Sequence, residues 1–366
     1  MLINGRYLSR AATGVDRFAN ELLRGVAAGL QPGQVLRVAT PAAAALQATD
    51  VPYAAELVPI GPGRGQWWEQ LTLPAAAGDA ALINLCTSAP ALRENQLVAI
   101  HDAATFANPA NFSAAFRTWY AVLLRSIASR ARVVATVSRF SADELTRHLG
   151  VPASRLEIIG EGGEHILRTP ADPSILERLG LGDQPYVLAV GSQSPNKNLR
   201  AVIDAMALLG DRKIRLVAAG GSNARIFADT VGADSAVLRT GYVSDAQLRA
   251  LYERAACFVF PSFYEGFGLP PLEAMCCDCP VIVANRSSLP EVCADAALYC
   301  DPADPASLAA ALRRLLDSAA LRDELRQAGR RRVAHFGWQR AATQFVDVVR
   351  GRFEVDLPAW RSEVAA

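Results

Sequence analysis

The sequence predicts an α/β protein with two domains, each built on a parallel sheet that helices cover on both faces. The 366-residue chain is long enough to form two hydrophobic cores. In both halves of the chain, short apolar runs typical of buried strands alternate with segments of helical length. Between the halves, residues 160–184 contain paired glycines and two prolines, a composition typical of a hinge.

The first half of the chain is expected to form six strands and three helices. Helix 15–28 carries apolar side chains at helical spacing, and helix 138–149 is expected to begin at a cap formed by Ser141. Residues 40–62, rich in alanine and proline, receive no assignment. The expected strands are 1–4, 36–39, 81–85, 97–100, 133–137 and 156–159, and the remaining helix is 116–129.

The second half repeats the alternation after a short helix at 174–179. Its expected strands are 186–190, 214–218, 237–239, 257–260, 281–284 and 297–299. Its expected helices are 199–209, 245–255, 269–276, 305–318 and 320–334. Ligands of such sheets bind beyond the carboxyl ends of the strands, so two Rossmann-like domains facing a ligand cleft are predicted.

The bulk composition excludes several classes of protein. Charged residues make up 20% of the chain and the net charge is +1, which gives no indication of nucleic acid binding. No run approaches the roughly 20 apolar residues of a membrane span. The first residues turn polar too early for a signal peptide, so a cytoplasmic location is expected.

The seven cysteines do not indicate a disulfide framework, because their number is odd and the chain lacks a signal peptide. Cys276-Cys277-Asp278-Cys279 has the spacing of a redox or metal-binding pair. No second pair or histidine cluster lies at zinc-ligand spacing. We therefore favour small buried apolar cysteines at a helix end and predict no metal site.

The most informative stretch is 260–274, where an apolar strand enters a glycine-bearing loop and then a helix. Prolines stand in the first turn of this helix, where a missing N–H costs little. Backbone N–H groups at such a helix start bind anions. Glu265 lies in the loop and Glu273 follows with seven residues between them, so the stretch predicts part of a nucleotide-sugar site.

A second loop, 191–199, also joins a strand to a helix. It lacks the Gly-Lys-Ser/Thr ending of a Walker loop, but Lys197 at the helix start is well placed to neutralise a diphosphate. The alternative, a solvated lysine, would be preferred if this loop stood alone. Gly220-Gly221 and Gly241-Tyr242-Val243 are further strand-end turns, and the second is a candidate ledge for a nucleotide base.

The pair Glu265 and Glu273, with Gly266-Phe267-Gly268-Leu269 between them, resembles the Glu-x7-Glu signature of family 4 retaining glycosyltransferases, which have the GT-B fold. Other family-like segments extend over nearly the whole chain. They are Thr13-Gly14-Val15, His101-Asp102, Ser138-Arg139-Phe140-Ser141, Lys197-Asn198-Leu199 and Phe336-Gly337-Trp338. The resemblance implies an acceptor-side domain at 1–168, completed by a crossover at 338–366, and a donor-binding domain at 169–337.

The resemblance also implies residue roles. Lys197 would bind the donor diphosphate, Glu265 the transferred sugar and Glu273 the ribose, while His101 would lie beside the sugar. We name Glu265, Lys197 and His101 as the catalytic candidates. The candidate donor-binding residues are Gly14, Gly191, Ser192, Val243, Gly266, Phe267, Gly268, Leu269 and Glu273.

Two segments depart from the family pattern. Ser192 stands where many members have an arginine on the phosphate, and Arg17 and Arg139 are candidate substitutes. Residues 160–165, which end at His165, replace a Pro-Asn-Gly turn.

The expected activity is retaining transfer of a hexose, with mannose from GDP-mannose preferred over a UDP-sugar donor. The acceptor is expected to be a glycan, carried on polyprenyl diphosphate. No cofactor and no essential metal are expected, because no Asp-x-Asp motif is present. The competing functions are a sugar-nucleotide epimerase, a phosphorylase, or a non-catalytic nucleotide-sugar-binding protein.

Residues 116–132 combine aromatic side chains with four arginines. Such a stretch can rest on an anionic membrane. The alternative is a core helix with a solvated basic edge.

Overall fold

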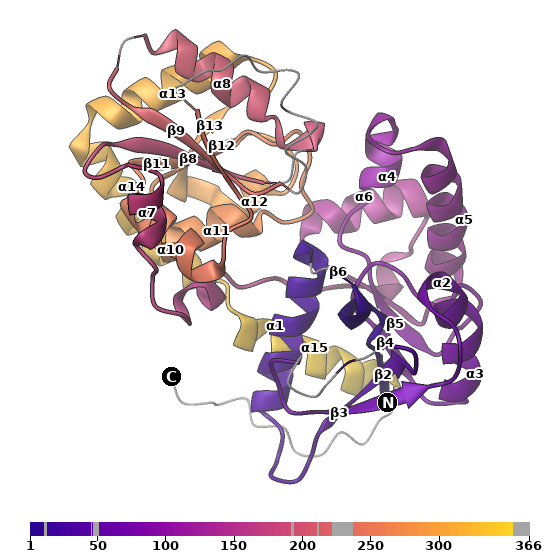
Figure 1. Cartoon of the computed structure of the whole chain (residues 1–366). Coiled ribbons are helices and arrows are strands. Elements are labelled where there is room, and N and C mark those ends of the chain that lie inside the picture. The colour runs from indigo at the N-terminus through magenta and orange to yellow at the C-terminus, as the bar shows by residue number, and fades with distance from the viewer. Residues whose placement is uncertain are drawn as a thin grey trace. The chain divides into compact units, whose positions relative to one another are not determined.

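The computed structural model describes residues 1–10, 13–44, 46, 51–191, 194–210, 212–221 and 237–353. The chain divides into two compact units (Figure 1). Unit 1 comprises Met1–Glu161 and the C-terminal segment that begins at Trp338, and unit 2 comprises Gly162–Gly337. Each unit is an α/β structure with its own parallel sheet.

The sheet of unit 1 has seven strands in the order β3-β2-β1-β4-β5-β6-β7, all parallel. In chain order, the strands are β1 (Leu2–Asn4), β2 (Leu36–Pro41), β3 (Ala55–Ile60), β4 (Leu82–Asn84), β5 (Gln96–Ala99), β6 (Val133–Thr136) and β7 (Leu156–Ile158). In the first pair, Ile3 stands opposite Val38. Strand β3 lies at the sheet edge, where the missing N–H of Pro59 is tolerated.

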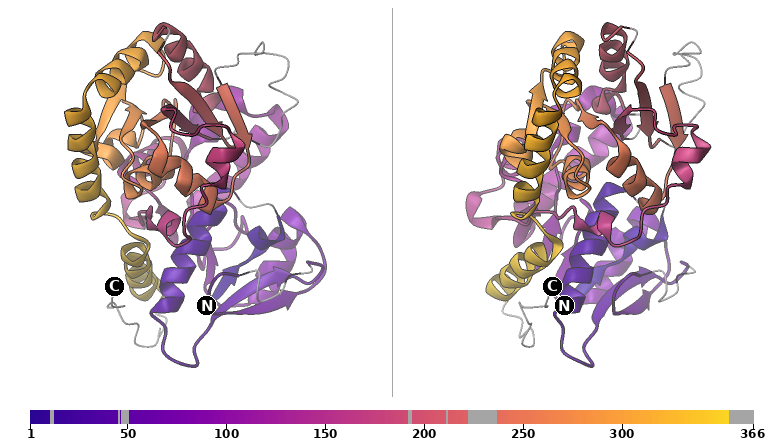
Figure 2. Two further views of the ribbon diagram at one scale, coloured as in Figure 1. Left: turned by 60° about the vertical axis from the view of Figure 1, so that its left-hand side comes forward. Right: turned by 90° about the vertical axis from the view of Figure 1, so that its left-hand side faces the viewer.

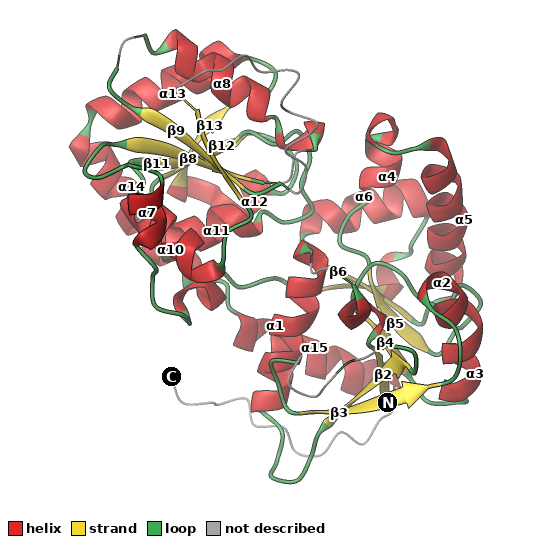
Figure 3. Ribbon diagram, in the orientation of Figure 1, coloured by secondary structure: helices red, strands yellow, loops and turns green. Residues whose placement is uncertain are grey.

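The helices of unit 1 cover both faces of this sheet, so every residue of β4, β5 and β6 is buried (Figure 3). The described helices are α1 (Gly14–Ala28), α2 (Gly65–Trp67), α3 (Leu73–Ala77), α4 (Ala104–Ala107), α5 (Ala114–Arg130), α6 (Arg139–Leu149) and α15 (Trp338–Phe353). A π-helical turn, Trp68–Thr72, joins α2 to α3. One buried cluster joins Trp68 and Leu73 to β1, β2 and β4, and a second joins α5 and α6 to β5 and β6.

Helix α15 belongs to unit 1 because it packs along α1 (Figures 1 and 2). Phe18 and Trp338 meet edge to face, with ring centroids 6.1 Å apart. At Gly25, an added Cβ would lie 2.9 Å from Cβ of Ala342 and 3.0 Å from the carbonyl oxygen of Trp338. Only glycine fits at this crossing without moving one of the helices.

The sheet of unit 2 has six parallel strands in the order β10-β9-β8-β11-β12-β13. The strands are β8 (Tyr186–Val190), β9 (Arg215–Ala219), β10 (Val237–Gly241), β11 (Cys257–Phe260), β12 (Val281–Ala284) and β13 (Ala297–Cys300). The described helices are α7 (Ser174–Arg178), α8 (Leu199–Leu208), α10 (Asp245–Arg254), α11 (Leu269–Cys276), α12 (Leu289–Cys293), α13 (Pro305–Asp317) and α14 (Ala319–Val333).

Alternate residues of these strands pack on opposite faces of the sheet. On one face, Val187 and Val259 join a buried cluster with side chains of α8 and α13. On the other face, the hydroxyl of Tyr186 donates to the carbonyl of Leu251 in α10 over 2.7 Å, and Phe258 meets Tyr252 edge to face. The continuous apolar strands predicted from the sequence therefore correspond to a sheet that is covered on both sides.

The structure corrects several expectations from the sequence. The helix at 139–149 is capped by Ser138, whose hydroxyl accepts from the amide of Ser141, so the choice of Ser141 as the cap was wrong. The units divide after Glu161 rather than at residue 168, because the 3-10 turn Glu164–Leu167 packs on α10 and α11. Strand β3 and helices α2, α3, α4 and α12 received no assignment. Within the described ranges, no helix has the length and apolar character needed to cross a membrane.

Candidate functional site

Two loops of unit 2 meet at the point where the strand order of its sheet reverses. From β8 the chain builds the sheet outward through β9 and β10, and it then returns to β11 on the other side of β8. The loop 191–198 follows β8 and the loop 261–268 follows β11. Because the strands are parallel, both loops lie at the carboxyl edge of the sheet, where α/β sheets bind their ligands.

Two asparagines hold these loops together. The side-chain amide of Asn196 donates to the carbonyl of Tyr264 over 2.6 Å, and the amide of Phe263 donates to the carbonyl of Asn196 over 3.0 Å. Asn198, with a left-handed φ of 57°, donates to the carbonyls of Pro261 and Pro302. Lys197 stands between these two anchors, so its backbone position is determined by the second loop.

Lys197 and Glu265 form an ion pair with Nζ 2.6 Å from Oε1. The side chains are 26% and 13% exposed, and Nζ also lies 5.0 Å from the ring centroid of Phe260. A Cβ on Gly191 would lie 3.1 Å from Cγ of Lys197, so the glycine gives room for the lysine stem. The structure thus brings together Lys197, Glu265 and Gly191, a cation and a carboxylate at the start of two helices.

The loop that carries Glu265 is held from the opposite side by two serines. The amide of Glu265 donates to Oγ of Ser287 over 3.0 Å. Oγ of Ser288 lies 2.9 Å from the carbonyl oxygen of Glu265 and 2.6 Å from that of Phe267, and its single proton can serve one of them at a time. These bonds give the backbone of the loop a defined shape.

Helix α11 begins directly after Gly268, whose φ is +117°. A Cβ at this residue would lie 2.8 Å from Cδ2 of Leu289, so both the conformation and the space require glycine. Gly266 and Phe267 are buried, and Leu269 is the first helical residue. The amides of 266–269 therefore belong to a helix start, which favours a negatively charged ligand.

Glu273 is buried in α11 and accepts two hydrogen bonds within unit 2. Its Oε1 lies 2.9 Å from Nε2 of His165, and its Oε2 accepts from the hydroxyl of Tyr252 over 3.2 Å. Burial, and then the nearby Glu273 carboxylate, raise the pKa of Tyr252, so this hydroxyl keeps its proton. The structure pairs Glu273 with His165 and Tyr252, and not with the Lys197–Glu265 pair.

His101 lies in unit 1, just after β5. Its Nε2 lies 2.9 Å from the carbonyl oxygen of Leu85, its ring meets Phe18 edge to face, and Nδ1 is 3.9 Å from a carboxylate oxygen of Glu161. Burial lowers the pKa of His101, although the Leu85 carbonyl and Asp16 oppose the shift. The neutral ring that results donates from Nε2 and offers a lone pair at Nδ1.

The other predicted residues are more simply placed. Gly14 is the first residue of α1, and a Cβ there would meet no described atom within 4 Å. Val243 is half-buried between β10 and the Ser244 cap of α10. Ser192 lies outside the described residues. Arg17 is in α1 and Arg139 begins α6, both in unit 1.

The cysteine stretch has the character of a packed helix end. Cys277 and Cys279 are buried, and burial raises the pKa of Cys276 to about 12. These thiols stay protonated and behave as small apolar groups. Over the described ranges, the structure shows no cluster of three or more histidine, cysteine or acidic side chains at metal-binding distance.

The residues that hold the site in place were not predicted from the sequence. These are Asn196, Asn198, Ser287, Ser288, Tyr252 and, as a partner of Glu273, His165. The left-handed conformation of Asn198 could have been predicted, because asparagine directly before a helix often adopts it. The others become partners only through long-range folding.

Part of the chain matches a described family and several named relatives. Residues 173–332 match the family described as glycosyl transferases group 1. The chain is 36% identical over 234 residues to O-antigen chain mannosyltransferase B of Escherichia coli, which covers 60% of this chain and 61% of that protein. It is 27% identical over 256 residues to O-antigen chain mannosyltransferase RfbU of Salmonella typhimurium, which covers 68% of this chain and 69% of that protein.

The fold has a close counterpart among solved structures. Sucrose-phosphate synthase from Thermosynechococcus elongatus aligns with a TM-score of 0.74 at 21% identity, over 96% of this chain and 98% of that chain. The predicted GT-B fold, with its two parallel-sheet domains, is therefore confirmed. The segment 173–332, which matches the family described as glycosyl transferases group 1, contains Lys197, Glu265 and Glu273. The match to mannosyltransferase B spans about three fifths of that relative's length.

Proposed function

We propose that the protein is a retaining glycosyltransferase that moves mannose from GDP-mannose to a saccharide acceptor. The observation that carries this proposal is the ion pair of Lys197 and Glu265 at the helix starts of a group 1 glycosyl transferase domain. The choice of mannose is supported by the 36% identity to a relative named as a mannosyltransferase. The choice of GDP over UDP follows from the same likeness, because no described side chain selects the base.

In the proposed reaction, the bond between the sugar C1 and the diphosphate oxygen breaks while the acceptor oxygen bonds to C1. The acceptor proton passes to the departing diphosphate, so GDP leaves and the sugar keeps its anomeric configuration. Lys197 and the amides of 266–269 stabilise the charge that develops on the leaving group. Glu265 binds hydroxyls of the sugar, Glu273 binds the ribose, and His101 lies beside the sugar.

In the proposed donor site, the Lys197 ammonium group must either weaken its ion pair with Glu265 or contact the Glu265 carboxylate and the donor diphosphate at the same time. Lysine suits this purpose because its ammonium group has three donors on a flexible stem. Charge stabilisation at the diphosphate then comes from a side chain and a helix start. We therefore propose that neither a metal ion nor a cofactor is required, and that transfer continues in EDTA.

The acceptor is proposed to be a glycan linked to polyprenyl diphosphate at a membrane surface. Helix α5 supports this choice, since Leu123, Leu124 and Ile127 are buried on one side while Trp119 and Val122 are 44% and 62% exposed. The helix carries three arginines and no acidic residue, which favours an anionic lipid surface.

Vesicle binding tests the membrane contact. The double variant Trp119→Ser/Val122→Ser should bind phosphatidylglycerol vesicles less well than the wild type, whereas Val35→Ser, an exposed apolar residue of unit 1 outside α5, should not. Equal sedimentation of all three proteins with these vesicles would refute the contact.

Calorimetry with GDP, UDP and ADP tests the donor. GDP should bind most tightly, and GDP-mannose should be consumed when acceptor is present. Tighter binding of UDP would indicate a UDP-sugar donor instead of GDP-mannose. If the folded protein binds none of the three nucleotides, the proposed donor site is wrong.

Substitution of Glu265 tests the catalytic assignment. Glu265→Ala should abolish mannose transfer but leave GDP binding largely intact, because Lys197 keeps its place between Asn196 and Asn198. Transfer at the wild-type rate would remove Glu265 from the mechanism.

A further inference from the structure

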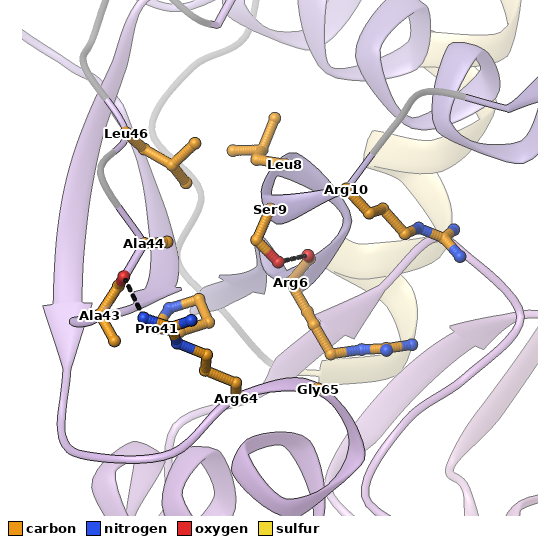
Figure 4. A pocket seen from close by; sticks show the side chains of 10 residues that line it. All are labelled: Arg6, Leu8, Ser9, Arg10, Pro41, Ala43, Ala44, Leu46, Arg64 and Gly65. Atoms are coloured by element: carbon orange, nitrogen blue, oxygen red, sulfur yellow. Dashed lines mark hydrogen bonds between the residues drawn. The ribbon is translucent and has the colours of Figure 1, made fainter.

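A cavity of about 590 Å³ lies within unit 1, whereas Lys197 and Glu265 belong to unit 2 (Figure 4). Its size is in the range of sites for small molecules. The described residues that line it are Arg6, Leu8, Ser9, Arg10, Pro41, Ala43, Ala44, Leu46, Arg64 and Gly65.

The lining comes from three segments that follow neighbouring strands. Residues 6–10 follow β1, residues 41–46 end and follow β2, and Arg64-Gly65 follow β3. These strands are adjacent and parallel in the sheet, so their carboxyl ends lie at one edge. The cavity thus has the position in which α/β sheets bind ligands.

Among the described residues that line the cavity, three are arginines and none is acidic. Two of them are held by carboxylates behind the lining. Nε of Arg6 lies 2.9 Å from Oε1 of Glu69, and Nη2 of Arg10 lies 2.7 Å from Oδ1 of Asp16. Glu69 and Asp16 are each 1% exposed.

These ion pairs orient the guanidinium groups and leave further N–H donors on each of them, since arginine has five. The pairs also cancel much of the charge of Arg6 and Arg10. Arg64 differs, because it is exposed and has no ion pair with a described carboxylate. Its one hydrogen bond within the described part of the chain is a long contact of 3.5 Å from Nη2 to the carbonyl of Ala43. Arg64 is therefore the main source of positive charge in the cavity.

We propose that this cavity binds the phosphate or diphosphate group of the acceptor. Arginine suits such a group because its planar fork of N–H donors matches phosphate oxygens. Ser9 adds a hydroxyl, whose proton is donated to the carbonyl of Arg6 in this structure and can reach a phosphate oxygen only by rotation about the Cβ–Oγ bond. Leu8, Pro41, Ala43, Ala44 and Leu46 give an apolar wall for the group attached to the phosphate.

The proposal rests on the proposed glycosyl transfer, but direct binding can be tested separately. Inorganic pyrophosphate should be titrated into full-length protein saturated with GDP, so that the donor site is filled. The wild type should bind it, and Arg64→Glu should bind about tenfold more weakly or worse, the effect of losing one charge-assisted contact. Arg37→Gln, an exposed arginine of β2, should bind as the wild type does.

Two further probes distinguish the source of the phosphate. Farnesyl diphosphate should bind more tightly than pyrophosphate if the acceptor is lipid-linked, and mannose 1-phosphate should do so if it is a phosphorylated sugar. Either result supports the anion site, provided that Arg64→Glu binds the same ligand more weakly than the wild type does. With acceptor in an activity assay, this variant should raise KM for the acceptor by about tenfold and change kcat little.

Equal pyrophosphate binding by wild type and Arg64→Glu, or no binding by either, would overturn the anion site even if GDP-mannose is the donor. Conversely, if GDP does not bind, the titration is made without it in the Lys197→Ala variant. If Lys197→Ala binds pyrophosphate and the double variant Lys197→Ala/Arg64→Glu does not, the cavity is supported even though the donor proposal fails.

Discussion

Nε2 of His165 lies 2.9 Å from Oε1 of Glu273, and the two side chains are buried together in unit 2. His165 comes from the turn at the start of the unit, whereas Glu273 is in α11, 108 positions further along the chain. Gly163, two residues before the histidine, makes this approach possible, because a Cβ there would lie 2.9 Å from the backbone of Leu272. The proposed ribose carboxylate is therefore oriented by the segment that replaces the family's Pro-Asn-Gly turn.

Loss of the imidazole should leave a buried carboxylate short of one donor. We expect His165→Ala to lower the free energy of unfolding by about 1–3 kcal/mol and to weaken GDP binding. His165→Gln, which retains an N–H donor, should recover part of both effects. Chemical denaturation would measure the loss of stability and calorimetry the loss of GDP affinity. If His165→Ala binds GDP as tightly as the wild type does, the proposed role of Glu273 in nucleotide binding is contradicted.

Lys197 should contribute to transfer far more than to folding. Lys197→Ala is expected to lower kcat/KM by about 100-fold to 1000-fold, as when one donor to a developing oxyanion is lost. Lys213, the other lysine of the sequence, is exposed and gives a matched control, since Lys213→Ala should transfer normally. Initial rates with labelled GDP-mannose would decide, and similar rates for both variants would contradict the role of Lys197.

Gly25 tests the packing of α1 against α15. Replacing a helical glycine by alanine usually stabilises a protein by about 0.5–1 kcal/mol. At Gly25 the added methyl group would meet Ala342 and Trp338, so we expect a net destabilisation of about 1–2 kcal/mol. Gly351→Ala, in α15 with no described atom near its Cβ, should be neutral or stabilising. Thermal unfolding should show a lower Tm for Gly25→Ala and an unchanged or higher Tm for Gly351→Ala. A higher Tm for Gly25→Ala would refute the close contact of α1 and α15.

His101 should make stability depend on pH. Burial holds its folded pKa below the value of about 6.5 in an unfolded chain. As pH falls below 6.5 the unfolded chain therefore takes up a proton first, and stability declines until the folded pKa is reached. Lowering the pH from 7.5 to 5.5 should thus reduce Tm more in the wild type than in His101→Gln. Parallel Tm profiles for the two proteins would contradict this prediction.

Local patterns in the sequence were sufficient to predict most of the elements. The central parallel strands of both sheets are nearly continuous apolar runs, because both faces of each sheet are covered there. Strand β3 escaped prediction because it is a half-exposed edge strand that contains a proline. The cap of α6 was misplaced by three residues, since either serine satisfies the same preference and only backbone geometry distinguishes Ser138 from Ser141.

The sequence by itself determined the residue types at the two strand ends of unit 2: a lysine, a carboxylate and glycines before helices. Their spacing already indicated an anion site. Tertiary structure alone decided the partners, because Lys197 meets Glu265 and Glu273 meets His165 across 68 and 108 positions of the chain. It also placed Arg6, Arg10 and Arg64 around one cavity. Contacts at such separations depend on strand order and register, which no local pattern encodes.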